Sequence, residues 1–161
     1  MRREFPEHPL VGVGGVVVHE GRVLLIRRGR EPLKGEWSIP GGMLELGEEL
    51  KDGVRRELLE ETGLEVEPLE HLITFERIAR EAHPRDPDGE PRVRYHFVII
   101  DYACRWLGGT LAPASDVVDA RWVAREDLPR YHLTEMAAAV INRAFEYFRS
   151  PASKQDGTGP G

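Results

Sequence analysis

One stretch of the chain, residues 41–64, carries three glutamates at a spacing that could hold a metal ion. Glu57 and Glu61 lie four residues apart, and Glu60 lies three residues after Glu57. On an α-helix, which turns by about 100° per residue, the three carboxylates fall within an arc of about 100°. They can therefore converge on one point in space, as the ligands of a cation do.

The same helix pattern predicts that these carboxylates face the body of the protein. Leu50, Val54 and Leu58 form an apolar stripe at four-residue spacing, and Glu61 projects at about the angle of that stripe. Carboxylates crowded on a partly buried face repel one another and are costly to desolvate. A hard divalent cation such as Mg²⁺ or Mn²⁺ removes that cost, because it prefers oxygen ligands. The alternative is a solvated helix laced with Glu–Arg pairs.

The elements that position this helix indicate a mixed α/β domain. Gly63 predicts the end of the acidic helix, and Thr134 predicts the N-cap of a second one. A short strand in "EWSIPGG" is halted by Pro40, and the proline-rich segment 82–91 predicts a loop. The expected strands span 11–18, 23–26, 65–80, 92–107 and 119–125, and the expected helices span 48–62 and 134–148. This order predicts a mixed sheet between helices.

Two other features favour structural interpretations. Gly12, Gly14 and Gly15 lie within a strand pattern, so they predict close backbone approach or a bulge and not a nucleotide-binding glycine loop. Cys104, the single cysteine, lies in an apolar run and predicts a buried core thiol. The histidines show no zinc-type spacing with it.

Composition and charge narrow the class of protein. The chain has 161 residues, 40% of them hydrophobic and 31% charged, which suits one domain over 1–149. The small, polar segment 150–161 predicts a disordered tail. A net charge of -6 argues against a nonspecific nucleic-acid partner. With no apolar run of membrane-spanning length, no signal-peptide pattern and a lone thiol, we expect a cytoplasmic protein with no membrane partner.

Residues 41–64, "GGMLELGEELKDGVRRELLEETGL", resemble the Nudix box, G-x5-E-x7-R-E-U-x-E-E-x-G-U, in which U is aliphatic. Every defined position is filled, by Gly42, Glu48, Arg56, Glu57, Leu58, Glu60, Glu61, Gly63 and Leu64. "GEWSIPGG" and "DARWV" are also similar to segments of that family, and the similarity covers residues 10–128. The resemblance implies the Nudix fold, an α/β/α sandwich with a mixed β-sheet. It also implies hydrolysis of nucleoside diphosphates linked to another group.

The resemblance also implies roles for individual residues. Glu57, Glu60 and Glu61 look like the metal-binding acids, joined by a carbonyl of Gly41 or Gly42, with Mg²⁺ as cofactor and Mn²⁺ as a substitute. Arg56 and Glu48 look like the pair that supports these acids and, with Glu57 and Glu60, complete the catalytic set. The group that takes the proton is Glu57 or an acid of a later loop, Asp116 or Asp119. The common Asp-Glu pair of that loop reads Asp116-Val117 here.

The substrate is less defined than the reaction. The sequence of residues 23–50 resembles that of the ADP-ribose pyrophosphatase group. This resemblance favours ADP-ribose or a related nucleotide sugar as the substrate. The proline often found after the box in that group is absent, since Ala79 and Arg80 stand there. Arginines suit phosphates and aromatic rings suit bases. The candidate substrate contacts are Arg28, Arg30, Trp37, Arg80 and Tyr95.

Two alternatives remain at this level. One is an enzyme that cleaves nucleoside or deoxynucleoside triphosphates to monophosphate and pyrophosphate. The other is a nucleotide-binding module without catalysis, although a pure binder has no need of all three box acids. The family resemblance also implies a possible homodimer.

Overall fold

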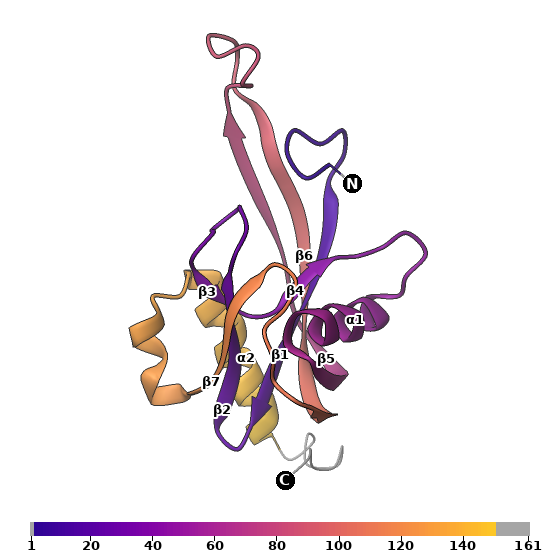
Figure 1. The fold of residues 1–161 in the computed structure, drawn as a ribbon, viewed down its shortest axis with the longest axis vertical. Helices are drawn as coiled ribbons and strands as arrows, with labels where there is room; N and C mark the ends of the chain where they lie inside the picture. Colours follow the sequence, from indigo (N-terminus) through magenta and orange to yellow (C-terminus); the bar gives the residue numbers. More distant parts are fainter. Residues whose placement is uncertain (1, 151–161) are drawn as a thin grey trace.

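The computed structural model describes residues 2–150, which form a strand-rich fold with two α-helices (Figure 1). In chain order the elements are β1(Leu10–His19), β2(Arg22–Arg28), β3(Trp37–Ser38), β4(Gly41–Met43), α1(Leu50–Thr62), β5(Leu64–Glu81), β6(Arg92–Gly109), β7(Val117–Ala124), the 3₁₀-helix η1(Arg125–Tyr131) and α2(Glu135–Arg149). Each expected strand and helix is present, with ends shifted by a few residues. The predicted tail lies, apart from Ser150, outside the described residues.

The ends of the helices follow the predicted signals. Gly63 adopts the left-handed conformation, with φ of 76°, and its N–H donates to the Leu59 carbonyl at the end of α1. The hydroxyl of Thr134 accepts a hydrogen bond from the N–H of Ala137 at the start of α2. Helix α1 begins at Leu50, two residues later than expected, because the N–H of Glu48 closes a turn onto the Glu45 carbonyl.

The sheet is mixed, as predicted. Its strand order is β3-β2-β1-β6-β5, with β4 paired to β1 and β7 paired to β2. Strands β1 and β6 run parallel, whereas the other pairs are antiparallel. Strand β1 pairs with β4 over Gly12–Gly14 and with β2 only at Val18 and His19, so the sheet divides along β1.

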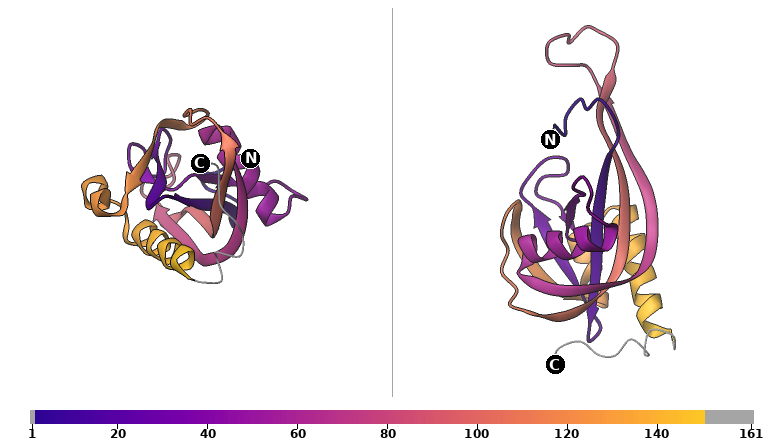
Figure 2. Two further views of the ribbon diagram at one scale, coloured as in Figure 1. Left: turned by 90° about the horizontal axis from the view of Figure 1, so that it is seen from below. Right: turned by 90° about the vertical axis from the view of Figure 1, so that its right-hand side faces the viewer.

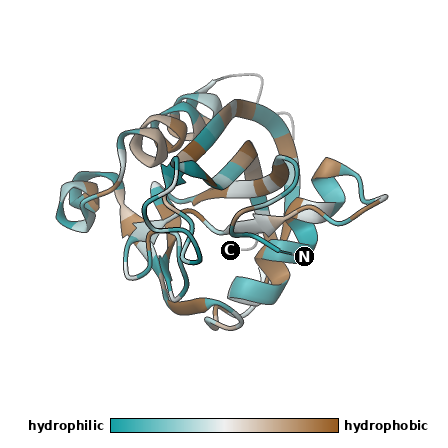
Figure 3. Cartoon of the chain, turned by 90° about the horizontal axis from the view of Figure 1, so that it is seen from above, coloured by the Kyte–Doolittle hydropathy of each residue, from teal (hydrophilic) through white to brown (hydrophobic). Residues whose placement is uncertain are grey.

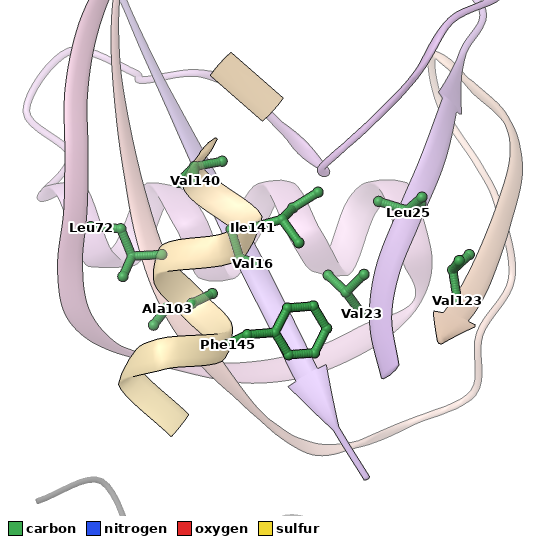
Figure 4. Packing of buried hydrophobic residues seen from close by; sticks show 10 residues of the cluster. Val16, Val23, Leu25, Leu72, Ala103, Val123, Val140, Ile141 and Phe145 are labelled. Carbon is green, nitrogen blue, oxygen red and sulfur yellow. The ribbon is translucent and has the colours of Figure 1, made fainter. Parts of the chain in front are cut away.

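The two helices cover opposite faces of the sheet (Figure 2), which confirms the α/β/α sandwich. Alternating β1 residues face in opposite directions. Val16 packs against Ile141 and Phe145 of α2, in the cluster drawn in Figure 4. Val17 belongs to the core under α1, together with Leu58. Figure 3 shows the corresponding alternation of hydrophobic and hydrophilic blocks along the strands.

Close approach between α1 and β1 explains one of the strand glycines. A Cβ at Gly15 would lie 2.9 Å from a methyl carbon of Leu58 and 2.8 Å from the sulfur of Cys104. Both distances are shorter than a carbon atom tolerates, so any larger residue would push the helix off the sheet. Cys104 is fully buried there, as predicted for a core thiol.

Strands β5 and β6 form a long hairpin that extends beyond the rest of the molecule (Figure 1). The predicted loop over 82–91 joins them at its tip. The N-terminal segment lies along this hairpin, because the N–H of Phe5 donates to the Arg94 carbonyl and its ring packs on His83 at 4.4 Å. No helix among residues 2–150 is long and apolar enough to cross a membrane.

Burial on α1 generates a stability prediction. Leu58 is 0% exposed and its neighbour Leu59 is 50% exposed. We expect Leu58→Ala to lower the free energy of unfolding by about 2–5 kcal/mol, because it leaves a cavity between helix and sheet. The matched control Leu59→Ala should change it by less than about 1 kcal/mol. Urea unfolding monitored by circular dichroism measures both, and equal losses would contradict the packing described.

Candidate active site

A cavity of about 270 Å³ opens where the sheet divides, between the end of α1 and the start of α2. Strands β1, β4, β5 and β6 and the loop before β7 contribute to its lining. Box residues Gly41, Gly42, Glu57, Glu60 and Glu61 lie together on one side of it. The structure therefore brings the predicted metal-binding acids and the two glycines to one pocket.

Glu61 is held in the wall of the cavity by the backbone of β4. The N–H of Gly41 donates to its Oε1 at 2.8 Å, and the residue is only 8% exposed. Burial raises the pKa of Glu61 to about 8, against the opposing effect of the Gly41 hydrogen bond, and the nearby charge of Glu57 adds to the rise. The carboxylate of Glu57 lies directly against the Cα of Gly42, where a side chain would collide with it. Burial raises the pKa of Glu57 too.

Arg56 donates hydrogen bonds to the acids but does not itself line the cavity. Its Nε and Nη2 donate to the two oxygens of Glu48 at 2.7 and 2.9 Å. Its Nη1 donates to Glu57 at 2.8 Å and to Glu60 at 3.3 Å, and Nη2 also donates to the Met43 carbonyl at 2.9 Å. The hydrogen bonds to Glu48 raise the pKa of Arg56 and lower that of Glu48. The predicted supporting pair is thus in contact with the acids.

The donor set fits a hard divalent cation. Glu61 is buried and Glu57 is half-buried, and the raised pKa of each reflects negative charge in a poorly solvated place, a cost that a cation would remove. Glu60, whose side chain is 51% exposed, stands at the rim. Within residues 2–150, no three Asp, Glu, His or Cys side chains are arranged closely enough to form a complete metal site by themselves. Backbone carbonyls, water and substrate oxygens would have to complete the coordination.

The two candidate loop acids are placed differently. Asp116 lines the cavity, and its Oδ2 accepts from Nη1 of Arg30 at 3.0 Å. Asp119 lies on β7 and is not among the lining residues. Its oxygens accept instead from the N–H of Ala120 at 2.8 Å and from Arg121 at 2.9 Å.

The candidate substrate contacts also divide into two groups. Arg28 and Arg30 line the cavity, and burial lowers the pKa of Arg28, whose Nε donates to the Pro32 carbonyl at 2.7 Å. Trp37, Arg80 and Tyr95 do not line it. The ring of Trp37 packs edge-on against Tyr131 at 5.1 Å, and Tyr95 is buried on Phe97 with its hydroxyl donating to Glu4. Arg80 is exposed near the end of β5.

Several lining residues were not identified from the sequence. They include Arg77 on β5, Asp101 on β6, Thr134 at the N-cap of α2, and Met136 and Val140 within α2. One signal was available, since Asp101 interrupts the apolar run "FVIIDYAC" and a charged residue there needs an explanation.

Comparison with known proteins agrees with this geometry. Residues 8–145 match the family model described as the NUDIX domain. An ADP-ribose pyrophosphatase of Methanocaldococcus jannaschii is 32% identical over 123 residues, which are 76% of this chain. The chain spans 66% of that relative's length, slightly less than two thirds.

Solved structures show the same fold. The crystal structure of a MutT NUDIX hydrolase from Burkholderia pseudomallei superposes with a TM-score of 0.68 and 29% identity, over 85% of this chain and 98% of that one. An ADP-ribose pyrophosphatase from Streptococcus suis 89-1591 gives a TM-score of 0.64 at 26% identity, over 89% and 95% of the two chains. With its complete box, its sandwich fold and a family match over most of its length, this chain belongs to the Nudix family.

Proposed function

We propose that the protein is a divalent-metal-dependent Nudix hydrolase that cleaves ADP-ribose, or a related nucleoside diphosphate sugar, to two monophosphates. The observation that carries this proposal is the pair of carboxylates, half-buried Glu57 and buried Glu61, held against β4 in the lining of a cavity that Arg28 also lines. The printed names of the Methanocaldococcus and Streptococcus relatives support ADP-ribose as the substrate.

In this proposal Glu57, Glu60 and Glu61 hold Mg²⁺ or Mn²⁺ together with a carbonyl of Gly41 or Gly42. The bound cation would polarise the bridging phosphates and lower the pKa of the attacking water. Arg56 keeps Glu57 and Glu60 in place through its guanidinium hydrogen bonds. The acids alone would repel one another, so this positive charge is needed to hold them together.

The remaining polar groups bind the substrate and accept the proton. Arg28 and Arg30 lie in the cavity and suit bidentate binding of phosphate oxygens. The water proton passes to a carboxylate oxygen of Glu57 or of Asp116. We favour Asp116 over Asp119 as the loop acid, because Asp119 points its oxygens at its own strand.

A substrate panel tests the proposed reaction. Purified protein with Mg²⁺ is expected to convert ADP-ribose and water to AMP and ribose 5-phosphate, monitored by chromatography. NADH, dinucleoside polyphosphates and deoxynucleoside triphosphates should be turned over more slowly. Pyrophosphate release from triphosphates without cleavage of ADP-ribose would favour the alternative of an enzyme that cleaves nucleoside or deoxynucleoside triphosphates. Absence of turnover with every substrate, in Mg²⁺ and in Mn²⁺, would leave a binding module.

Removing the carboxylate of Glu61 should lower the rate of hydrolysis without lowering the thermal stability of the protein. In Glu61→Gln the amide oxygen can still accept from the N–H of Gly41, so the thermal unfolding midpoint should not fall. Turnover should decrease at least about a hundredfold, as is typical when a metal ligand is lost. The control is Glu65→Gln, the same substitution at an exposed position outside the cavity. Wild-type turnover in Glu61→Gln would exclude the ligand role.

The supporting role of Arg56 is tested by changing its shape at constant charge. Arg56→Lys cannot serve Glu48, Glu57 and the Met43 carbonyl together, because an ammonium group lacks the planar fork. We expect about a 10–100-fold loss of activity and a higher Mg²⁺ concentration at half-maximal rate. Arg55→Lys is the matched control, since Arg55 pairs with Asp52 on the exposed side of α1. Equal kinetics in the two variants would contradict the assignment.

A further inference from the structure

The deep end of the cavity holds a carboxyl group that the proposed reaction does not use. Asp101 lies on β6, is 3% exposed and lines the cavity. Within residues 2–150 it forms no hydrogen bond and no ion pair, and only the more distant charge of Arg77 acts on it. Burial raises its pKa to about 7. Its oxygens face the cavity without a donor from the described part of the chain, so a ligand that donates a hydrogen bond there would stabilise the poorly solvated carboxyl group.

The backbone around Asp101 is shaped to keep this carboxyl group in the cavity. Asp101 stands beside Gly14 of β1, and Gly14 stands beside Gly41 of β4. A Cβ at Gly14 would lie 2.5 Å from the Oδ1 of Asp101, so the carboxylate occupies the space that a side chain would take. The next inward-facing residue of β6 on this side, Ala103, is fully buried. Asp101 therefore marks the floor where the cavity meets the α2 core.

The neighbouring side chains form an apolar platform beside this carboxyl group. Phe75 and Ile99 are paired across β5 and β6, face the same side as Asp101 and line the cavity. Arg77 follows on the far side of the platform, paired with Phe97. Its partner Phe97 lies four positions before Asp101 along β6, so the backbone at Arg77 is roughly 13 Å from that at Asp101 along the strand direction. Met136 and Val140 of α2 cover the platform. An aromatic ring and aliphatic side chains beside one unpaired carboxyl group suit an aromatic base better than a sugar.

The distance from the acids also suits a nucleoside. Gly41, whose N–H contacts Glu61, and Asp101 are separated by one strand, so their Cα atoms lie roughly 10 Å apart. This is comparable with the span from a phosphate group to the far edge of the attached purine. A diphosphate held at Glu57 and Glu61 would thus place its base over Phe75.

We propose that Asp101 determines nucleobase specificity, by accepting a hydrogen bond from the exocyclic amino group of an adenine that lies on Phe75. This inference rests on the proposed function for the identity of the nucleotide. A base with a carbonyl oxygen in place of the amino group would set two acceptors against each other. Where Asp101 is ionised, above pH about 7, such a base is disfavoured because its carbonyl gives the carboxylate no donor at that position, and the binding comparison is therefore made above that pH.

Binding of AMP and IMP tests this proposal without any need for turnover. The two nucleotides differ at position 6 of the purine, which is an amino group in AMP and a carbonyl in IMP. Calorimetry should show that wild-type protein with Mg²⁺ binds AMP at least about tenfold more tightly than IMP. In Asp101→Asn, whose amide can donate or accept, the ratio should fall to about threefold or less. Asp101→Ser, which is smaller and fits the same space, should lower the ratio in the same way.

The control is Glu76→Gln, which removes a carboxylate from the same hairpin at an exposed position outside the cavity. It should keep the wild-type ratio. Equal binding of AMP and IMP by the wild type would overturn the proposal, as would an unchanged ratio in both Asp101 variants. A loss confined to discrimination between AMP and 2′-deoxy-AMP would also overturn it, by assigning Asp101 to the ribose. Failure of the hydrolase proposal would appear separately, as intact binding without cleavage of ADP-ribose.

Discussion

The site depends on the guanidinium group of Arg56. One planar fork donates to Glu48, Glu57, Glu60 and the Met43 carbonyl, so it links the loop before α1 to the helix itself. Without it, several carboxylates would face one another at a partly buried surface, and their mutual repulsion would open the turn. The positive charge of Arg56 opposes this repulsion and holds the acids close together. The box arginine is therefore a structural requirement as well as a support for chemistry.

Backbone proximity is the second constraint, and glycines provide it. Glu57 reaches the cavity because Gly42 has no side chain in its path, and α1 lies close to β1 because Gly15 has none. A side chain at Gly42 would collide with the carboxylate of Glu57, and one at Gly15 would collide with the side chains of Leu58 and Cys104. These side chains or the helix would have to shift, and a shift of α1 would weaken its contacts with β4, which include the hydrogen bond from Gly41 to Glu61.

The sequence predicted the parts of the site that lie on one helix, but it did not identify the parts that distant strands bring together. Helical spacing placed Glu57 and Glu61 together correctly, because three or four residues on one helix fix their relative position. The floor of the cavity depends on the parallel pairing of β1 with β6, which brings Asp101 beside Gly14 across 87 positions of sequence. No local pattern specifies that pairing. Trp37 and Tyr95 were plausible stacking residues by type, but their rings pack within the fold instead.

The two ends of the cavity are formed by elements on the two faces of one sheet. Helix α1 supplies the acids and β4 the backbone against which they lie, whereas β5, β6 and α2 supply the walls of the deep end. The two parts meet across β1, where Gly12 and Gly14 line the cavity and leave it open. Substitutions on β6 or at the start of α2 can therefore alter the shape of the deep end without moving Arg56 or its partners. In the proposed reaction, the complete box would act on the diphosphate, and the choice of nucleotide would fall to residues that lie far from the box in sequence, such as Asp101.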